Sequence, residues 1–146
     1  MIEIRVGAED FDAAQWLARL EALGGGAVAS FTGIVRGGGG LKSLQLDHYP
    51  AMTQAQIERI VAEANARWPL LGIVVIHRIG LLLPADRIVF VGTASSHRAA
   101  ALESCAFLID WLKTSAPFWK KESFEDGQES WVEARHEDDV ALERWR

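Results

Sequence analysis

Apolar and polar residues follow two different spacings along the chain. Short β-rich runs, several of them alternating apolar with polar positions, predict strands over residues 2–6, 27–36, 41–49, 72–80, 87–95, 118–124 and 129–135. Apolar residues repeat at helical spacing over residues 10–23, 51–68 and 97–115. This order predicts an α+β fold, with three helices packed on a mainly antiparallel sheet.

The ends of these elements give more specific expectations. Asp10 is a candidate N-cap for the first helix. The third helix has a core-facing stripe that includes Leu102 and Cys105, and Pro117 lies just past its end. We expect one domain over residues 1–136, followed by a charged tail over residues 137–146 that is mobile or depends on a partner for its order.

Composition excludes several classes of protein. The net charge of −5 argues against a general nucleic-acid surface, which needs an excess of Lys and Arg. No run of apolar residues is long enough to span a membrane, and the first residues show no signal-peptide pattern. The single cysteine fits a reducing compartment, so we expect a cytoplasmic protein.

Two lysines, Lys113 and Lys120, stand around an apolar turn that also holds Phe118 and Trp119. A helix end followed by a returning strand can bring both lysines to one pocket, which the two aromatic rings could wall. A desolvated lysine beside another cation has a lowered pKa and becomes a usable base or nucleophile. The alternative is that Lys113 and Lys121 are solvated, with Lys113 favoured by the negative end of the helix dipole.

His97 and Arg98 fall at the start of the third helix, where free N–H groups already favour an anion. Two more positive groups there suggest a phosphate or carboxylate ligand, although a solvated helix start is the alternative. His97 and Lys113 are sixteen residues apart on this helix, which separates them by about 24 Å. Either they serve different sites, or a second copy of the chain brings His97 and Arg98 to the lysine pocket in a symmetric dimer.

Arg36 ends a strand beside four glycines, where a guanidinium can bind a phosphate or remain an ordinary exposed group. Those glycines lack the pattern of a nucleotide-binding loop. Cys105 is expected in the core rather than as a nucleophile. His48, His77 and His136 have no ligand spacing, so we expect neither a metal site nor a cofactor.

Seven stretches are spread in order over residues 31–135: "FTGIVR", "LDHYPAMT", "RWPL", "VIHRIG", "DRIVFVGTASSHR", "DWLKTSAPFWKKE" and "WVEAR". On these stretches the chain resembles the large, catalytic subunit of molybdopterin synthase. The resemblance implies an α/β hammerhead-like arrangement with a small β subdomain. It also implies a sulfurtransferase of molybdenum cofactor biosynthesis, which converts a cyclic pyranopterin monophosphate into the dithiolene molybdopterin.

The resemblance further implies partners and roles. Sulfur arrives as a thiocarboxylate on the C-terminal Gly-Gly of a small ubiquitin-like subunit, and two large subunits form the central homodimer of a heterotetramer. The positions that match catalytic lysines are Lys113 and Lys120. We expect Lys113 to act as acid, base or amine partner, and Lys120 to neutralise developing charge. The positions implied to bind substrate are Arg36, His97, Arg98, Lys121 and Glu122.

One position departs from the family, because Ile34 stands where relatives often have a lysine. Two other functions stay open on the sequence. The chain could be a non-catalytic, anion-binding scaffold that docks a ubiquitin-like tail. It could also be an unrelated single-domain enzyme that acts on a phosphorylated small molecule without a protein partner.

Overall fold

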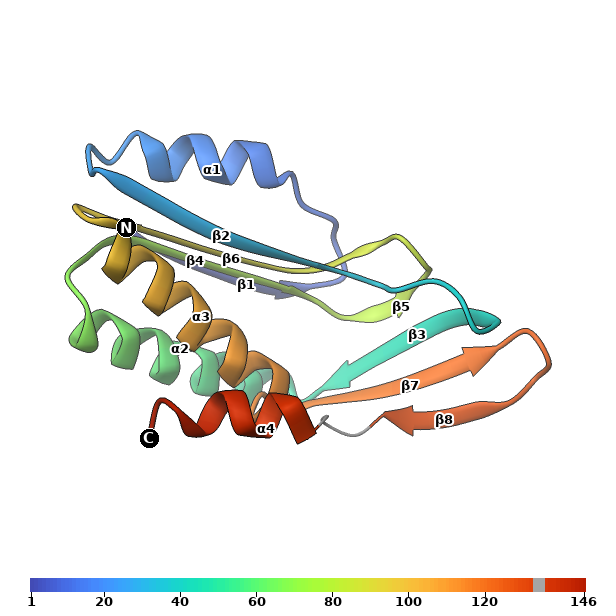
Figure 1. Cartoon of the computed structure of the whole chain (residues 1–146). Coiled ribbons are helices and arrows are strands. Elements are labelled where there is room, and N and C mark those ends of the chain that lie inside the picture. Colours follow the sequence, from blue (N-terminus) through green and yellow to red (C-terminus); the bar gives the residue numbers. More distant parts are fainter. Residues whose placement is uncertain (133–135) are drawn as a thin grey trace.

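The computed structural model describes residues 1–132 and 136–146 (Figure 1). Strands and helices are separated in the sequence by glycine, proline or a capping side chain, where the spacing of apolar residues changes. In chain order the described elements are β1 (Ile2–Gly7), α1 (Ala13–Glu21), β2 (Ala27–Ile34), β3 (Leu41–His48), α2 (Pro50–Arg67), β4 (Leu70–Arg78), β5 (Gly80–Leu82), β6 (Arg87–Ser95), α3 (Arg98–Thr114), β7 (Phe118–Phe124), β8 (Glu129–Val132) and α4 (His136–Glu143).

The strands form two four-stranded sheets. The first has the order β1-β4-β6-β2, and the second has the order β5-β3-β7-β8. Only β1 and β4 pair in parallel among the described strands; the other pairs are antiparallel. Helix α1 covers one face of the first sheet, and α2 and α3 cover the other, while the second sheet projects to one side (Figure 1).

The central strand β4 is buried on both faces, and strand periodicity divides its side chains between two cores. Ile73 and Val75 pack into the larger core with α2 and α3. Val74 and Ile76 point the other way, into the core under α1. Successive side chains of a strand alternate between its two faces. Because helices cover both faces of this sheet, side chains on both faces of the strand are buried and an uninterrupted apolar run is favoured.

The predicted α+β class, with its mainly antiparallel sheet and a small additional β unit, is confirmed. Several local expectations differ from the structure. The N-cap of α1 is Asp12, whose carboxylate accepts from the N–H of Ala14 at 3.0 Å, rather than Asp10. Asp10 instead accepts from Arg87 at 2.9 Å. Leu102 is 60% exposed and lies outside the α3 core stripe.

The C-terminal segment holds more structure than the sequence suggested. It forms α4, which packs on α3. The Trp145 indole N–H donates to the Asp110 carboxylate at 2.6 Å, and the Trp145 carbonyl accepts from Arg67 at 2.6 Å. Residues 133–135 of the last expected strand lie outside the described residues. None of the helices in the described ranges is long and apolar enough to cross a membrane.

Candidate functional site

A cavity of about 710 Å³ lies where the end of α3 meets β7 and the loop after β2. Its charged lining comes from both halves of the chain: Arg36, Lys113, Lys120, Glu122 and Asp138. Apolar side chains complete the walls, among them Leu44, Ile88, Leu112 and Phe118. The cavity therefore combines an apolar floor with a few convergent polar groups, which is typical of small-molecule sites.

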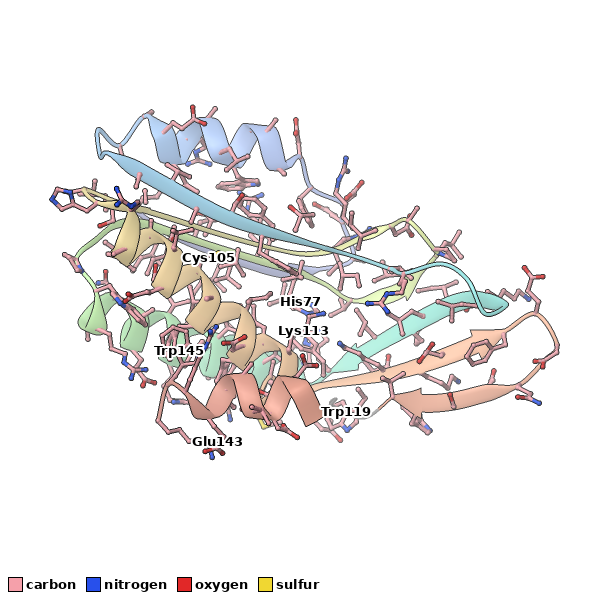
Figure 2. The ribbon with its side chains drawn as sticks, viewed as in Figure 1. His77, Cys105, Lys113, Trp119, Glu143 and Trp145 are labelled. Carbon is pink, nitrogen blue, oxygen red and sulfur yellow. The ribbon has the colours of Figure 1, made fainter. Side chains whose placement is uncertain are left out.

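Lys113 and Lys120 reach this cavity from the two sides of one turn. Lys113 stands in the last turn of α3, which ends at Ser115 (Figure 2). The Phe118 N–H then donates to the Ala116 carbonyl at 2.8 Å and starts β7. On β7 the side chains alternate, so Phe118, Lys120 and Glu122 line the cavity while Trp119 and Lys121 do not.

The environment of Lys120 favours its neutral amine. Burial lowers the Lys120 pKa, and the nearby positive charge of Lys113 lowers it further. The Asp138 carboxylate raises the Lys120 pKa and partly opposes both effects. Both lysines line the cavity, so a ligand bound there would lie beside them.

Arg36 is positioned at the cavity by the backbone of the preceding residue, Val35. The Val35 N–H donates to the Asp86 carbonyl at 2.8 Å, and the Val35 carbonyl accepts from Ala85 at 2.9 Å. The glycines that follow contribute Gly37, Gly38 and Gly39 to the lining. Gly38, Gly39 and Gly40 all have positive φ, from 62° to 101°, a conformation that other residues rarely adopt.

Four of the residues singled out in the sequence lie elsewhere. His97 and Arg98 are exposed at the start of α3, the end that points away from the second sheet (Figure 1). Lys121 faces the other side of β7 and pairs with Glu129 at 3.6 Å. Trp119 was expected to wall the lysine pocket, but its ring is 42% exposed and packs edge-on against Tyr49. The pleat of β7 explains both departures on that strand.

Two residues near the lysines were not singled out by the sequence. Asp138 lines the cavity from α4, within a segment whose many charges gave no indication of this contact. His77 lies behind Phe118, with its ring stacked on the phenyl ring at a centroid distance of 3.9 Å. The sequence could have indicated His77, because it is a polar residue in the otherwise apolar run of β4 and buried polar side chains are uncommon in such strands.

Cys105 is buried, and burial raises the pKa of its thiol to about 12. This agrees with a place in the core rather than a nucleophile. Among the side chains that the structure describes, no group of three or more His, Cys, Asp or Glu residues comes together in a way that could hold a metal ion.

Comparison with known proteins gives consistent matches. The family model described as "MoaE protein" matches residues 6–115. The molybdopterin synthase catalytic subunit of Escherichia coli is 48% identical over 98% of this chain and 97% of its own length. The corresponding Pseudomonas aeruginosa protein is 49% identical over 97% of both chains.

Solved structures agree with these sequence matches. The molybdopterin biosynthesis MoaE protein from Burkholderia ambifaria has a TM-score of 0.83 and 49% identity, covering 99% of this chain and 98% of that one. A Helicobacter pylori structure, described as a complex of subunits 1 and 2 of molybdopterin-converting factor, matches with a TM-score of 0.69 and 26% identity. That match covers 92% of this chain and 90% of the other.

Proposed function

Because the chain belongs to the MoaE family, we propose that its two-lysine cavity is the site of sulfur transfer in molybdopterin synthesis. The chain is a molybdopterin synthase catalytic subunit, an enzyme of molybdenum cofactor biosynthesis. The observation that carries the proposal is the meeting of Lys113, Lys120 and Arg36 on one cavity, with the Lys120 pKa lowered. Perturbed pKa values of this kind are common at catalytic sites.

The donor is the C-terminal thiocarboxylate of a small ubiquitin-like subunit, and the acceptor is cyclic pyranopterin monophosphate. A solved relative is a complex of the two subunits of molybdopterin-converting factor, which supports assembly with a small subunit here. Each transfer forms a C–S bond at a carbon of the pterin side chain and breaks a C–O bond there, whose oxygen leaves as water or stays on the phosphate. Water then cleaves the acyl C–S bond that still joins this sulfur to the carrier, and the carrier is released as a carboxylate. We place this chemistry in the cytoplasm, where a carrier thiocarboxylate and a lone cysteine both remain reduced.

The electrostatics favour a division of roles opposite to the one expected from the sequence. Lys120 has the lowered pKa, so it is the better base or amine partner for the acyl group. Lys113 supplies positive charge beside it, which can stabilise charge that develops on the carbonyl or on the leaving oxygen. Glu122 lines the same cavity, where it can accept a hydrogen bond from the pterin.

Arg36 and the glycine loop supply an anion contact on the side of the cavity away from α4. Its guanidinium can bind the substrate phosphate with two parallel hydrogen bonds. The three lining glycines leave their backbone N–H groups uncovered by side chains, so the same loop can add contacts to the phosphate. The lysine that relatives often have at the position of Ile34 is then not required, because the backbone N–H groups of the loop can make the anion contact in its place.

Reconstitution tests the proposal. The purified chain is mixed with a thiocarboxylated small subunit and the cyclic pyranopterin, and dithiolene product is measured for the wild type, Lys113→Ala and Lys120→Ala. We expect both variants to lose rate while small-subunit binding is unchanged. A folded wild type that binds the small subunit but makes no product would instead indicate a scaffold, and product without the small subunit would indicate an unrelated enzyme.

We also propose that a second copy of the chain completes each site with His97 and Arg98. Their position at the far end of α3 from Lys113 supports this, because one small ligand cannot span that helix. Mixing inactive His97→Ala with inactive Lys113→Ala subunits provides the test. Shared sites regain activity in mixed dimers, up to about a quarter of the wild-type sites after random exchange, whereas sites within one subunit regain none.

A further inference from the structure

His77 stands behind the cavity wall that carries Lys120. It is the eighth residue of β4, and strand alternation places it on the same face as Ile73 and Val75, towards α2 and α3. Its side chain is buried, with 4% of the residue exposed. The imidazole lies nearly parallel to the Phe118 ring, with centroids 3.9 Å apart and planes inclined by 14°. Phe118 is in turn a lining residue of the cavity.

The hydrogen bonding of His77 fixes which nitrogen carries the proton. Its Nδ1 lies 2.8 Å from the Arg78 carbonyl oxygen. Because a carbonyl oxygen only accepts, Nδ1 must donate, and Nε2 is the unprotonated nitrogen of the neutral ring. This bond also sets the rotation of the ring, so the plane that stacks on Phe118 is held by the β4 backbone.

The ring remains neutral at any working pH. Burial lowers the His77 pKa to about 3, despite the Arg78 carbonyl bond, which raises it. The positive groups that face the ring from other elements lower it further: Lys120 from β7, Lys113 from α3 and His48 from β3. A group with this pKa cannot take a proton from substrate near neutral pH, so general-base chemistry is not its role.

His48 is a second ring close to Phe118. It pairs with Phe118 across β3 and β7, and its ring centroid lies 6.1 Å from that of Phe118. Its Nδ1 lies 3.1 Å from the Thr53 hydroxyl, which ties it to α2. Phe118 therefore has one ring from each sheet close to it, on a wall of the cavity that holds both lysines.

We propose that His77 is a positioning residue for sulfur transfer: stacked on Phe118 and anchored to the Arg78 carbonyl, it closes the back of the cavity against water without adding a charge beside the two lysines. The proposal rests on the proposed role of Lys120. A charged or hydrated group at this position would weaken the desolvation that lowers the Lys120 pKa. A neutral aromatic ring with one internally satisfied N–H meets both requirements.

The test follows the Lys120 side chain directly and needs no turnover. Lysine side chains are ¹³C-labelled, the Lys120 signal is assigned with Lys120→Arg, and its titration midpoint is measured by NMR in the whole protein. The other charged groups of the cavity, Arg36, Lys113, Glu122 and Asp138, are left unchanged in every variant. We expect His77→Ala to move the midpoint upward, towards that of an exposed lysine, because water reaches the amine.

Two further variants distinguish the loss of the aromatic ring behind Phe118 from a general loss of stability. His77→Phe keeps an aromatic ring, so we expect the midpoint to stay near the wild-type value. Ile76→Ala creates a comparable gap on the opposite face of β4, under α1, and should destabilise the fold without moving the midpoint. In sulfur transfer, His77→Ala should lose several-fold in rate at neutral pH and recover at alkaline pH, whereas a merely destabilised enzyme would lose rate at both.

The outcomes distinguish this inference from the proposed function. An unchanged Lys120 midpoint in folded His77→Ala would overturn the role of His77, as would an equal upward shift in His77→Phe and His77→Ala. Normal turnover in Lys120→Ala would instead overturn the proposed chemistry of Lys120, and the titration would still report whether His77 keeps that side chain dry.

Discussion

Asp110 anchors the C-terminal segment to α3, and its removal should loosen α4. The carboxylate is 13% exposed and accepts from the Trp145 indole at 2.6 Å and from Arg144 at 2.8 Å. The Trp145 ring also packs edge-on against Trp68 and Phe107, each at a centroid distance of 5.7 Å. We expect Asp110→Ala to remove the polar contacts and leave the aromatic packing to hold the segment.

The size of the effect follows from these contacts. A hydrogen bond from a largely buried indole to a carboxylate contributes about 1.5–3 kcal/mol. The Arg144 pair contributes at most about 1 kcal/mol, because the arginine side chain is 56% exposed. Together they give about 1.5–4 kcal/mol, which corresponds to a fall of roughly 4–15 °C in Tm if α4 unfolds with the domain.

Hydrogen exchange and thermal unfolding together check this prediction. Exchange in α4 should accelerate about 30-fold for each 2 kcal/mol lost. Glu143→Ala is the matched control, since it removes one carboxylate from an exposed pair with Arg146 in the same segment (Figure 2). The control should change stability by less than about 0.5 kcal/mol. Wild-type Tm and α4 protection in Asp110→Ala would refute the anchoring account.

Three other changes give clear expectations. Asp138→Asn removes the carboxylate that raises the Lys120 pKa, so the acidic limb of the rate profile should move to lower pH; Asp139→Asn, an exposed neighbour, should leave it in place, and equal profiles for both would contradict the assignment. The Cys105 thiol should resist a maleimide at mildly alkaline pH until the protein unfolds, and labelling of the native chain at the rate of a free thiol would show the burial to be wrong. Gly25→Ala should destabilise the fold by about 1–3 kcal/mol in chemical denaturation, because its Cβ would lie 2.5 Å from the backbone carbonyl that ends β6; an unchanged midpoint would mean that this contact can relax.

The sequence predicted the elements that bury continuous apolar stripes. Helix α2 was recognisable because Ile57, Ile60, Val61 and Ala64 repeat at helical spacing, and all four are buried. The sequence also indicated that Lys113 and Lys120 would lie close together, because a helix end and a returning strand meet at the proline-containing turn between them. These features depend on local spacing, which the sequence records directly.

Features that depend on tertiary contacts were harder to predict. Helix α4 has little apolar character of its own and is held by Asp110, a residue on another helix. Leu102 matched the spacing of the α3 stripe but lies on its exposed side. The face of β7 on which Lys121 lies follows from the pairing register with β3, and the sequence alone does not set that register.

The most direct test of the central claim is a single-turnover assay of sulfur transfer with arginine in place of each lysine in turn. Arginine keeps the positive charge but cannot act as an amine or a base, because its pKa stays above 12. We predict that Lys120→Arg is as inactive as Lys120→Ala, while Lys113→Arg retains much of the wild-type rate. An active Lys120→Arg together with an inactive Lys113→Arg would contradict the account and would assign the amine chemistry to Lys113.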